Sequence, residues 1–300
     1  MALPSSRKVT KVVIPVAGMG TRFLPATKAL PKELLPVVSK PIIHHIIEEA
    51  VKAGLETVVL VTSRPKVVIE DYFDPGDLTS YRLAESHKEK LIEEVLYLSS
   101  KIDIVSIRQY KPMGLGHAIL RAKPIVEGQP FAVILGDDIM KCSGPSAIHQ
   151  CLNVFQERGE GSVVGAVQVE REATRLYGVI DPAPSIEDIK KGSWRLKDFV
   201  EKPDPAEAPS EWALPGRYVF EPEILEELQN AGPGKNGEIQ LTDSMQKLQA
   251  RKPFWACALE GERFDTGDRL GYIMANVAYA LEEESTHHAL RTWLSRQLAR

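Results

Sequence analysis

Residues 11–36 read KVVIPVAGMGTRFLPATKALPKELLP, and this stretch decides the fold class. The β-branched run at residues 11–17 predicts a buried parallel strand. The strand ends at Gly18, and Gly20 follows two residues later. Glycines let the backbone approach a ligand closely, and successive N–H groups can surround an anion. The strand and its loop therefore predict an anion site at one edge of an α/β sheet.

Three further residues narrow the kind of anion. The loop is not a P-loop, because GxxxxGK[ST] is absent, and Phe23 stands where a dinucleotide-binding fingerprint needs its third glycine. Arg22 and Lys32 place two cations beside the glycines. Arginine binds phosphate as a planar fork and lysine as a point charge. We therefore favour a triphosphate site over a bare turn with two solvated cations.

The rest of the chain alternates strands and helices up to about residue 160, which predicts a doubly wound parallel sheet. Beyond residue 160, short strands dominate and predict a mixed, partly antiparallel extension. The predicted strands are 57–62, 102–107, 131–135, 162–169, 178–181, 194–201 and 212–220. The predicted helices are 41–53, 86–99, 115–123, 222–229, 238–250, 268–281 and 285–298, with a surface loop at 203–211.

Composition excludes several classes of protein. The 300 residues carry 37 basic and 41 acidic side chains, a net charge of −4, so no nucleic-acid partner is expected. The three cysteines form no CxxC pair, which argues against a disulfide framework or structural zinc. Neither a signal peptide nor an apolar run long enough to cross a bilayer is apparent. We expect a cytoplasmic protein with no membrane partner.

The segment RQYKPMGLGHA, residues 108–118, follows a predicted strand and opens a predicted helix. The amide of Gln109 both donates and accepts, as a pyrimidine edge requires. Gly114 would let a flat ring lie against the backbone. The alternative is a polar loop with a glycine-based helix start. His117 is more readily explained by helix capping or packing than by ligand binding.

Candidate metal-binding carboxylates occur at two places. Asp137 and Asp138 follow a buried strand, where open α/β sheets bind ligands. Neighbouring strand residues point to opposite faces, so only one of the two can readily enter a cleft. Asp265 stands before the predicted helix at 268–281. Mg²⁺ takes one or two protein carboxylates and completes its octahedron with phosphate and water. Each aspartate alone is equally well explained by a strand end or a helix cap.

Two short motifs lie in the strand-rich half. Tyr177 and Gly178 begin YGV, and Glu201 and Lys202 occur in FVEKP. A sugar phosphate needs a carboxylate for its hydroxyls and a cation for its phosphate, and this dipeptide supplies both. An isolated Glu–Lys pair would ordinarily be a surface ion pair. The segment NGEIQLTD at 236–243 predicts a turn and a helix start, without assigned chemistry.

The loop and the later motifs together resemble the nucleotide-sugar pyrophosphorylases over nearly the whole chain, to about residue 280. The match is carried by AGMGTRFLPATKALPKELLPVVSKP, and Lys28 with the Lys32–Glu33 pair follows the uridylyl-transferring pattern. The resemblance implies a Rossmann-like nucleotidyltransferase fold with a central, mostly parallel mixed sheet flanked by helices. It implies one domain over 1–300, with a nucleotide half at about 8–160, a sugar-phosphate half at about 161–266 and C-terminal helices at about 267–300.

The resemblance also implies residue roles. Catalytic contacts are expected from Arg22, Lys32 and Lys202, and nucleotide contacts from Ala17, Gly18, Gly20, Thr21, Gln109 and Gly114. Sugar-phosphate contacts are expected from Gly178, Glu201 and Lys202, and Mg²⁺ ligands from Asp137 and Asp265. Gly136 differs from the residue that is usual in the family before the first aspartate. This difference concerns the choice of substrate more than the binding of the metal.

The implied activity is transfer of the uridylyl group of UTP to glucose 1-phosphate by direct displacement. A thymidylyl-transferring relative is the first alternative, because uracil and thymine differ by one methyl. The second is a weakly active regulatory relative, although every expected cation and carboxylate is present. A homodimer or homotetramer is expected from the resemblance alone. The last helix could pack on the chain's own core or on another subunit.

Overall fold

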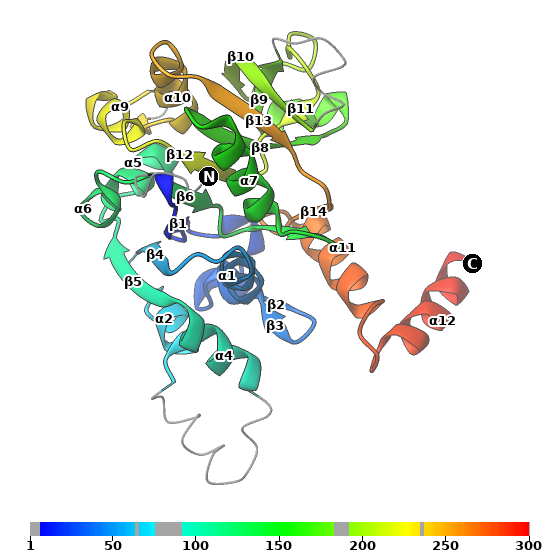
Figure 1. The fold of residues 1–300 in the computed structure, drawn as a ribbon. Helices are drawn as coiled ribbons and strands as arrows, with labels where there is room; N and C mark the ends of the chain where they lie inside the picture. Colours follow the sequence, from blue (N-terminus) through cyan, green and yellow to red (C-terminus); the bar gives the residue numbers. More distant parts are fainter. Residues whose placement is uncertain (1–6, 64–65, 76–91, 183–191, 235–236, 300) are drawn as a thin grey trace.

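The computed structural model describes residues 7–63, 66–75, 92–182, 192–234 and 237–299. Within them, ten strands form one continuous sheet in the order β11-β9-β10-β13-β8-β12-β6-β1-β4-β5 (Figure 1). The strands of this sheet are β1 (Lys11–Pro15), β4 (Thr57–Thr62), β5 (Asp103–Arg108), β6 (Phe131–Ile134), β8 (Ser162–Gln168), β9 (Gly178–Pro182), β10 (Ser193–Glu201), β11 (Trp212–Ala213), β12 (Arg217–Phe220) and β13 (Phe254–Ala258).

One half of the sheet is parallel. β1 pairs with β6 on one side and β4 on the other, and β4 pairs with β5, all in parallel register. Their carboxyl ends therefore meet at the same edge. The glycine loop follows β1, Gln109 follows β5 and Asp137 follows β6. The predicted nucleotide residues thus gather at one edge.

The other half is largely antiparallel, and β12 joins the two halves. β12 is antiparallel to both β6 and β8, β13 is parallel to β8, and β10 is antiparallel to β13 and β9. The sheet is therefore mixed, and the expectation of a mostly parallel sheet was wrong. β9, β10 and β11 pair antiparallel with their neighbours β10, β9 and β8, whereas β13 takes its parallel place beside β8 only after α9 and α10.

The helices cover both faces of the sheet, and successive residues of β1 show why. Val12 and Ile14 pack with α1 and α7, whereas Val13 packs with α5 and α10, since strand side chains alternate between faces. The helices are α1 (Ile42–Lys52), α2 (Val68–Phe73), α4 (Glu93–Lys101), α5 (Gly114–Arg121), α6 (Lys123–Val126), α7 (Ala147–Arg158), α9 (Ile224–Asn230), α10 (Leu241–Gln249), α11 (Arg269–Ala280) and α12 (His287–Leu298).

Two small ribbons complete the fold. β2 (Pro36–Val37) pairs with β3 (Lys40–Pro41), and β7 (Asp138–Lys141) pairs with β14 (Glu262–Asp265). In the second ribbon Asp138 lies opposite Asp265, which brings the distant aspartate segments together. No helix within the described ranges is long and apolar enough to cross a membrane.

Several predictions of individual elements need correction. The predicted strand at 212–220 is two strands, β11 and β12, because Pro215 and Gly216, with φ of 84°, interrupt it. β7, β13, β14, α2 and α7 were not predicted. The predicted helix at 86–99 lies partly outside the described residues, and α4 covers its described end. α12 buries none of its residues and extends away from the body, so it does not pack on the core (Figure 1).

Candidate functional site

The glycine loop wraps around Lys32. Gly20 has φ of 63°, a conformation that favours glycine, and a Cβ there would come within 3.2 Å of Lys32 Cβ. Thr27 Oγ1 donates to the Gly20 carbonyl over 2.7 Å, which closes the loop. Thr21 begins a 3-10 turn, Thr21–Phe23, and is exposed. The loop thus holds the lysine stem in a fixed path while leaving Thr21 accessible.

Lys32 donates to the Oδ2 atom of Asp137, which follows β6. The Lys32 side chain is 16% exposed and that of Asp137 is 32% exposed, so the pair lies half-buried at the sheet edge. Burial opposes charge on both groups, but the mutual attraction prevails. It raises the pKa of Lys32, and with Arg22 it lowers the pKa of Asp137. Both groups are therefore charged at neutral pH.

Gly267 brings the two predicted metal ligands together. A Cβ at Gly267 would lie 2.8 Å from Asp137 Oδ2 and 3.1 Å from Asp265 Oδ1. Arg22 Nη1 donates to the Gly267 carbonyl over 3.3 Å, so its guanidinium lies beside the same pair of carboxylates. The structure therefore gathers Arg22, Lys32, Asp137 and Asp265 around one small space, although Arg22 and Asp265 lie at opposite ends of the sequence.

This donor set fits a magnesium ion. Two carboxylates converge, and hard oxygen ligands of this kind are what Mg²⁺ prefers. No group of three or more His, Cys, Asp or Glu side chains among the described residues could enclose a metal. A bound ion would thus need phosphate and water for its other positions, which suits a metal that arrives with a nucleotide.

Asp265 is held by residues to which the sequence had assigned no role. Tyr177 Oη donates to its Oδ2 over 3.2 Å, and the Gly267 amide donates to its Oδ1 over 3.0 Å. The guanidinium of Arg263 lies 4.4 Å from the centre of the Tyr177 ring and makes a bidentate contact with Asp138 Oδ2. Arg263 and Asp265 lie on the same face of β14, because alternate strand residues share a face. The sequence shows this spacing, but its meaning depends on the partner strand β7.

Asp138 faces away from Asp137, as the strand alternation predicted. It is buried, and it pairs with Arg217 as well as Arg263. Arg217 is fully buried and donates to Glu49 of α1 over 2.6 Å. Asp138 therefore serves the packing of β7, β12 and α1, and Asp137 alone of the two lies at the sheet edge with Lys32.

The sugar-side residues meet at the ends of β9 and β10. Gly178 lies opposite Glu201, and a Cβ at Gly178 would come within 3.3 Å of Glu201 Oε2. Thr242 Oγ1 donates to that same oxygen over 3.3 Å. Lys202 is 59% exposed, with its Nζ 3.4 Å from Glu201 Oε1. Tyr177 joins this group to Asp265, so the predicted metal and sugar residues form one connected surface.

Lys202 adopts an unusual backbone conformation. Its φ is 47°, in the left-handed region that side chains with a Cβ rarely occupy. Its amide donates to the Tyr177 carbonyl over 3.0 Å, which holds the turn in place. Strain of this kind collects where a side chain must be aimed in one direction.

A cavity of about 610 Å³ lies beside the loop and is lined by Ala17, Met19, Ser63, Arg108, Gln109, Tyr110 and Pro112. A smaller hollow of about 150 Å³ lies between Gly18 and Lys32 and shares Met19 and Ser63 with it. The first is wide enough for a nucleobase, and the second leads toward the cations. Ala17, Gly18 and Gln109 thus line one continuous stretch of surface.

Gly114 also has a packing role that the sequence did not predict. A Cβ there would come within 2.8 Å of Glu238 Cβ and 3.0 Å of the Ile239 carbonyl, and φ is 89°. Gly114 therefore allows close packing of α5 against residues 237–243. The Ile239 amide donates to the Met113 carbonyl, and the Ile239 carbonyl accepts from the Gly116 amide. Ile239 of the NGEIQLTD segment therefore holds the start of α5 in place.

A separate buried ion pair lies beneath the loop. Lys66 Nζ donates to both carboxylate oxygens of Glu33 over 2.9 and 2.7 Å, and both side chains are almost fully buried. Burial raises the pKa of Glu33 against the attraction of Lys66 and Lys32. The sequence marked the Lys32–Glu33 dipeptide but gave no sign of Lys66 as its partner.

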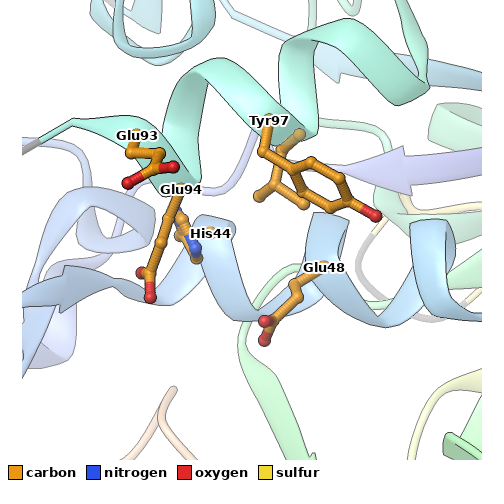
Figure 2. Close-up of a pocket in the computed structure, with 6 residues that line it drawn as sticks. His44, Glu48, Glu93, Glu94 and Tyr97 are labelled. Carbon is orange, nitrogen blue, oxygen red and sulfur yellow. The ribbon is translucent and has the colours of Figure 1, made fainter. Parts of the chain in front are cut away.

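A further hollow, of about 270 Å³, lies between α1 and α4, where Figure 2 shows its lining side chains. It is lined by His44, Glu48, Glu93, Glu94, Tyr97 and Leu98. His44 Nδ1 lies 3.0 Å from Tyr72 Oη, and Glu94 pairs with Lys40 over 2.5 Å. None of the predicted site residues lines this hollow, so it is distinct from the site at the sheet edge.

A family model described as nucleotidyl transferase matches residues 11–282. The chain belongs to the nucleotidyl transferase family. The resemblance drawn from the loop is therefore confirmed. Two curated relatives are the UTP–glucose-1-phosphate uridylyltransferase of Bacillus subtilis and the UTP–glucose-1-phosphate uridylyltransferase 2 of Staphylococcus saprophyticus. They are 45% and 43% identical over 284 residues, which is 95% of this chain and 95% and 96% of theirs.

Solved structures agree with this family membership. A UDP-glucose pyrophosphorylase complexed with UDP-glucose superposes with a TM-score of 0.83 at 39% identity, covering 92% of this chain and all of that one. A UTP-bound relative from Acinetobacter baumannii superposes with a TM-score of 0.87 at 35% identity, covering 96% of this chain and 99% of that one. The nucleotidyltransferase fold with a mixed sheet therefore extends over nearly the whole chain.

Proposed function

We propose that this chain transfers the uridylyl group of UTP to glucose 1-phosphate, giving UDP-glucose and pyrophosphate. The observation that carries the proposal is the convergence of Lys32, Asp137 and Asp265 between a base-sized cavity and the Glu201–Lys202 pair. This order along the surface matches base, triphosphate and sugar phosphate. The substrates named for the curated relatives have the same three parts.

The attacking group is an oxygen of the sugar phosphate, which is already an anion at neutral pH. It forms a bond to the α-phosphorus of UTP, the bond from that phosphorus to the bridging oxygen breaks, and pyrophosphate leaves with the electron pair. No side chain has to remove a proton. The protein must instead align the two phosphates and offset the repulsion between them.

Each cation has a place in this scheme. Arg22 binds the triphosphate beside Asp137 and Asp265. Lys32 stabilises the charge that develops during transfer, and Lys202 holds the sugar phosphate. Gly178 and Glu201 bind the sugar hydroxyls, and Ala17, Gly18, Gly20, Thr21, Gln109 and Gly114 form or support the nucleotide pocket. Mg²⁺, bound through Asp137 and Asp265, would screen the phosphate charges and favour departure of pyrophosphate.

The test is pyrophosphate release from the purified protein with glucose 1-phosphate and Mg²⁺, with UTP, dTTP, CTP, ATP and GTP supplied in turn. A strong preference for UTP supports the proposal. Rates with dTTP equal to or above those with UTP would assign the chain to thymidylyl transfer instead, and nucleotide binding without turnover would indicate a regulatory relative.

Lys202→Met tests the sugar-phosphate role separately. We expect a rise in the KM for glucose 1-phosphate and a smaller change in the KM for UTP, because Lys202 lies with Glu201 rather than with the glycine loop. Lys247→Met on α10 is the matched control. An equal effect of both substitutions on both substrates would contradict the assignment.

Three finer expectations belong to the same proposal. The chain acts as a single nucleotidyltransferase domain, it works in the cytoplasm, and it assembles as a homodimer or homotetramer. The exposed helix α12, which buries none of its residues, is available for such an assembly. Light scattering of the full chain measures the oligomeric state directly.

A further inference from the structure

The amide of Gln109 is held in one orientation. The Gln109 backbone amide donates to Thr62 over 2.8 Å, which fixes the residue at the end of β5, and its side chain lines the 610 Å³ cavity. Gln109 is only 9% exposed. A carboxamide has a donor end and an acceptor end, so its rotation decides what the cavity offers to a ligand.

Both hydrogens on Nε2 are used within the protein. Nε2 donates to the Gly114 carbonyl over 3.1 Å, and it lies 3.0 Å from Nδ1 of His117. A carbonyl only accepts, so the NH₂ end of the amide must face Gly114. The second hydrogen then points at His117, and Oε1 is left as the free end. No described residue donates to Oε1.

His117 can accept this hydrogen in one state only. Nδ1 accepts when the proton of the neutral ring is on Nε2, and it becomes a donor when the ring is charged. Burial and the nearby charge of Arg121 lower the pKa of His117, which favours the neutral ring. The tautomer with the proton on Nε2 is thus the one that satisfies Gln109.

The geometry points to His117 as a positioning residue that directs Gln109 Oε1 toward the base and so selects a pyrimidine with a ring N–H. Uracil carries such an imide N–H, whereas the matching ring nitrogen of cytosine is an acceptor and would face Oε1 without a hydrogen between them. Thymine shares the imide, so this device separates UTP from CTP and not UTP from dTTP. The inference rests on the proposed use of UTP.

The surroundings keep His117 in place. α5, which carries it, is bound to the neighbouring segment through Gly116 N to Ile239 O over 3.0 Å and Ile239 N to Met113 O over 2.8 Å. Gly116 has no room for a Cβ, because the Ile239 carbonyl would lie 2.7 Å away. The helix start therefore cannot shift to compensate for a lost acceptor.

A matched pair of variants tests the role. His117→Asn keeps an acceptor, Oδ1, at the position of Nδ1, while His117→Leu has nearly the same shape as asparagine and no acceptor. For His117→Leu we expect the KM for UTP to rise about tenfold, since a buried amide hydrogen loses its partner. We expect kcat to change by no more than about twofold. The ratio of kcat/KM for UTP over CTP should narrow by about tenfold or more.

His117→Asn should retain most of the wild-type KM and of the UTP preference. Equilibrium binding of UTP and CTP, measured by calorimetry without sugar phosphate, should repeat the pattern. Thermal unfolding of each variant checks that the fold is kept. Wild-type KM and wild-type base preference in His117→Leu would overturn the inference, and so would equal losses in the two variants.

The wild-type protein supplies an independent measurement. Nitrogen-15 NMR of the histidine rings should show His117 with an unprotonated Nδ1 and a proton on Nε2 at neutral pH. A proton on Nδ1 would overturn the inference whatever the variants do. A wild-type protein that does not turn over UTP contradicts the proposed function itself, whereas normal use of UTP with an unaffected His117→Leu contradicts only the role of His117.

Discussion

The ammonium group of Lys32 donates to Oδ2 of Asp137, so one predicted catalytic cation is bound to one predicted metal ligand. When a metal-bound triphosphate arrives, either Lys32 leaves Asp137, or Asp137 contacts the metal and Lys32 at the same time. The pair keeps both groups charged and aimed at the same space before substrate arrives. Preorganised charge of this kind needs no rearrangement when negative charge develops during transfer.

Lys32→Ala should lower kcat/KM by roughly 30- to 1,000-fold, which corresponds to about 2–4 kcal/mol of transition-state stabilisation. Steady-state pyrophosphate release measures the change. Lys8→Ala, which removes an exposed ion pair with Glu56, is the control and should leave turnover unchanged. Near-normal turnover of Lys32→Ala would rule out the catalytic role.

Gly267→Ala should weaken magnesium binding, because the added methyl would lie 2.8 Å from Asp137 Oδ2 and 3.1 Å from Asp265 Oδ1. The Mg²⁺ concentration for half-maximal activity should rise by about 10- to 100-fold, as for other changes that reorient metal ligands. Gly144→Ala, where nothing lies within 4 Å, is the matched control. An unchanged Mg²⁺ titration would show that the carboxylates are not the metal site.

Arg217→Met should destabilise the fold by about 3–5 kcal/mol, because it leaves Glu49 and Asp138 as buried carboxylates without this partner. Urea unfolding gives the free energy. The double variant Glu49→Leu, Arg217→Met should lose less than the sum of the two single changes. Strict additivity would mean that the buried pair is not coupled.

The stability of the protein should fall as the pH is lowered from about 6.5 to about 4, partly because of His45. Burial, then the charge of His44, lowers the pKa of His45 from 6.5 to about 4, against the opposing effect of Glu48. The unfolded chain binds a proton in this window and the folded chain does not, so the contribution is complete above pH 6.5 and lost toward pH 4.

His45→Phe removes this contribution while keeping a ring beside Tyr279, whose centroid is 4.8 Å away. The difference in unfolding free energy between pH 7 and pH 4.5 should be smaller in the variant, by no more than about 3 kcal/mol. Urea titrations at both values measure it. A difference as large as in the wild type would assign the acid sensitivity to other groups.

Much of the fold could be predicted because its signals are local. β4 was predicted at its exact bounds, and α1, α10 and α11 to within a few residues, since apolar periodicity marks them and Gly54 marks the end of α1. β7 and β14 were not predicted because a short strand of mixed composition is defined by its partner, and the apolar β13, FWACA, was also missed. The mixed sheet likewise depends on where β12 inserts, which no local pattern encodes.

The site residues, like the strands and helices, could be predicted where the signal is local and not where it depends on a distant partner. The glycine loop, Asp137 and Asp265 could be named from sequence motifs. The structure brings the two aspartates together beside Gly267. Lys66, Arg217 and Arg263 could not be named, because each acts through a residue distant in sequence. The sequence predicted a capping or packing role for His117, and only the 3.0 Å distance from its Nδ1 to Gln109 Nε2 indicates a positioning role.

β12 is hydrogen-bonded to β6 on one side and β8 on the other, so the strand that precedes Asp137, the strand that begins at Gly178 and the strand that ends at Glu201 belong to one continuous sheet. A hinge between the two halves would have to break those backbone bonds. The span from base pocket to sugar pocket is therefore constant. A single molecule that joins a uridine to a glucose phosphate should therefore bind without a closing motion, and its affinity should be greatest when the linker length matches this fixed span.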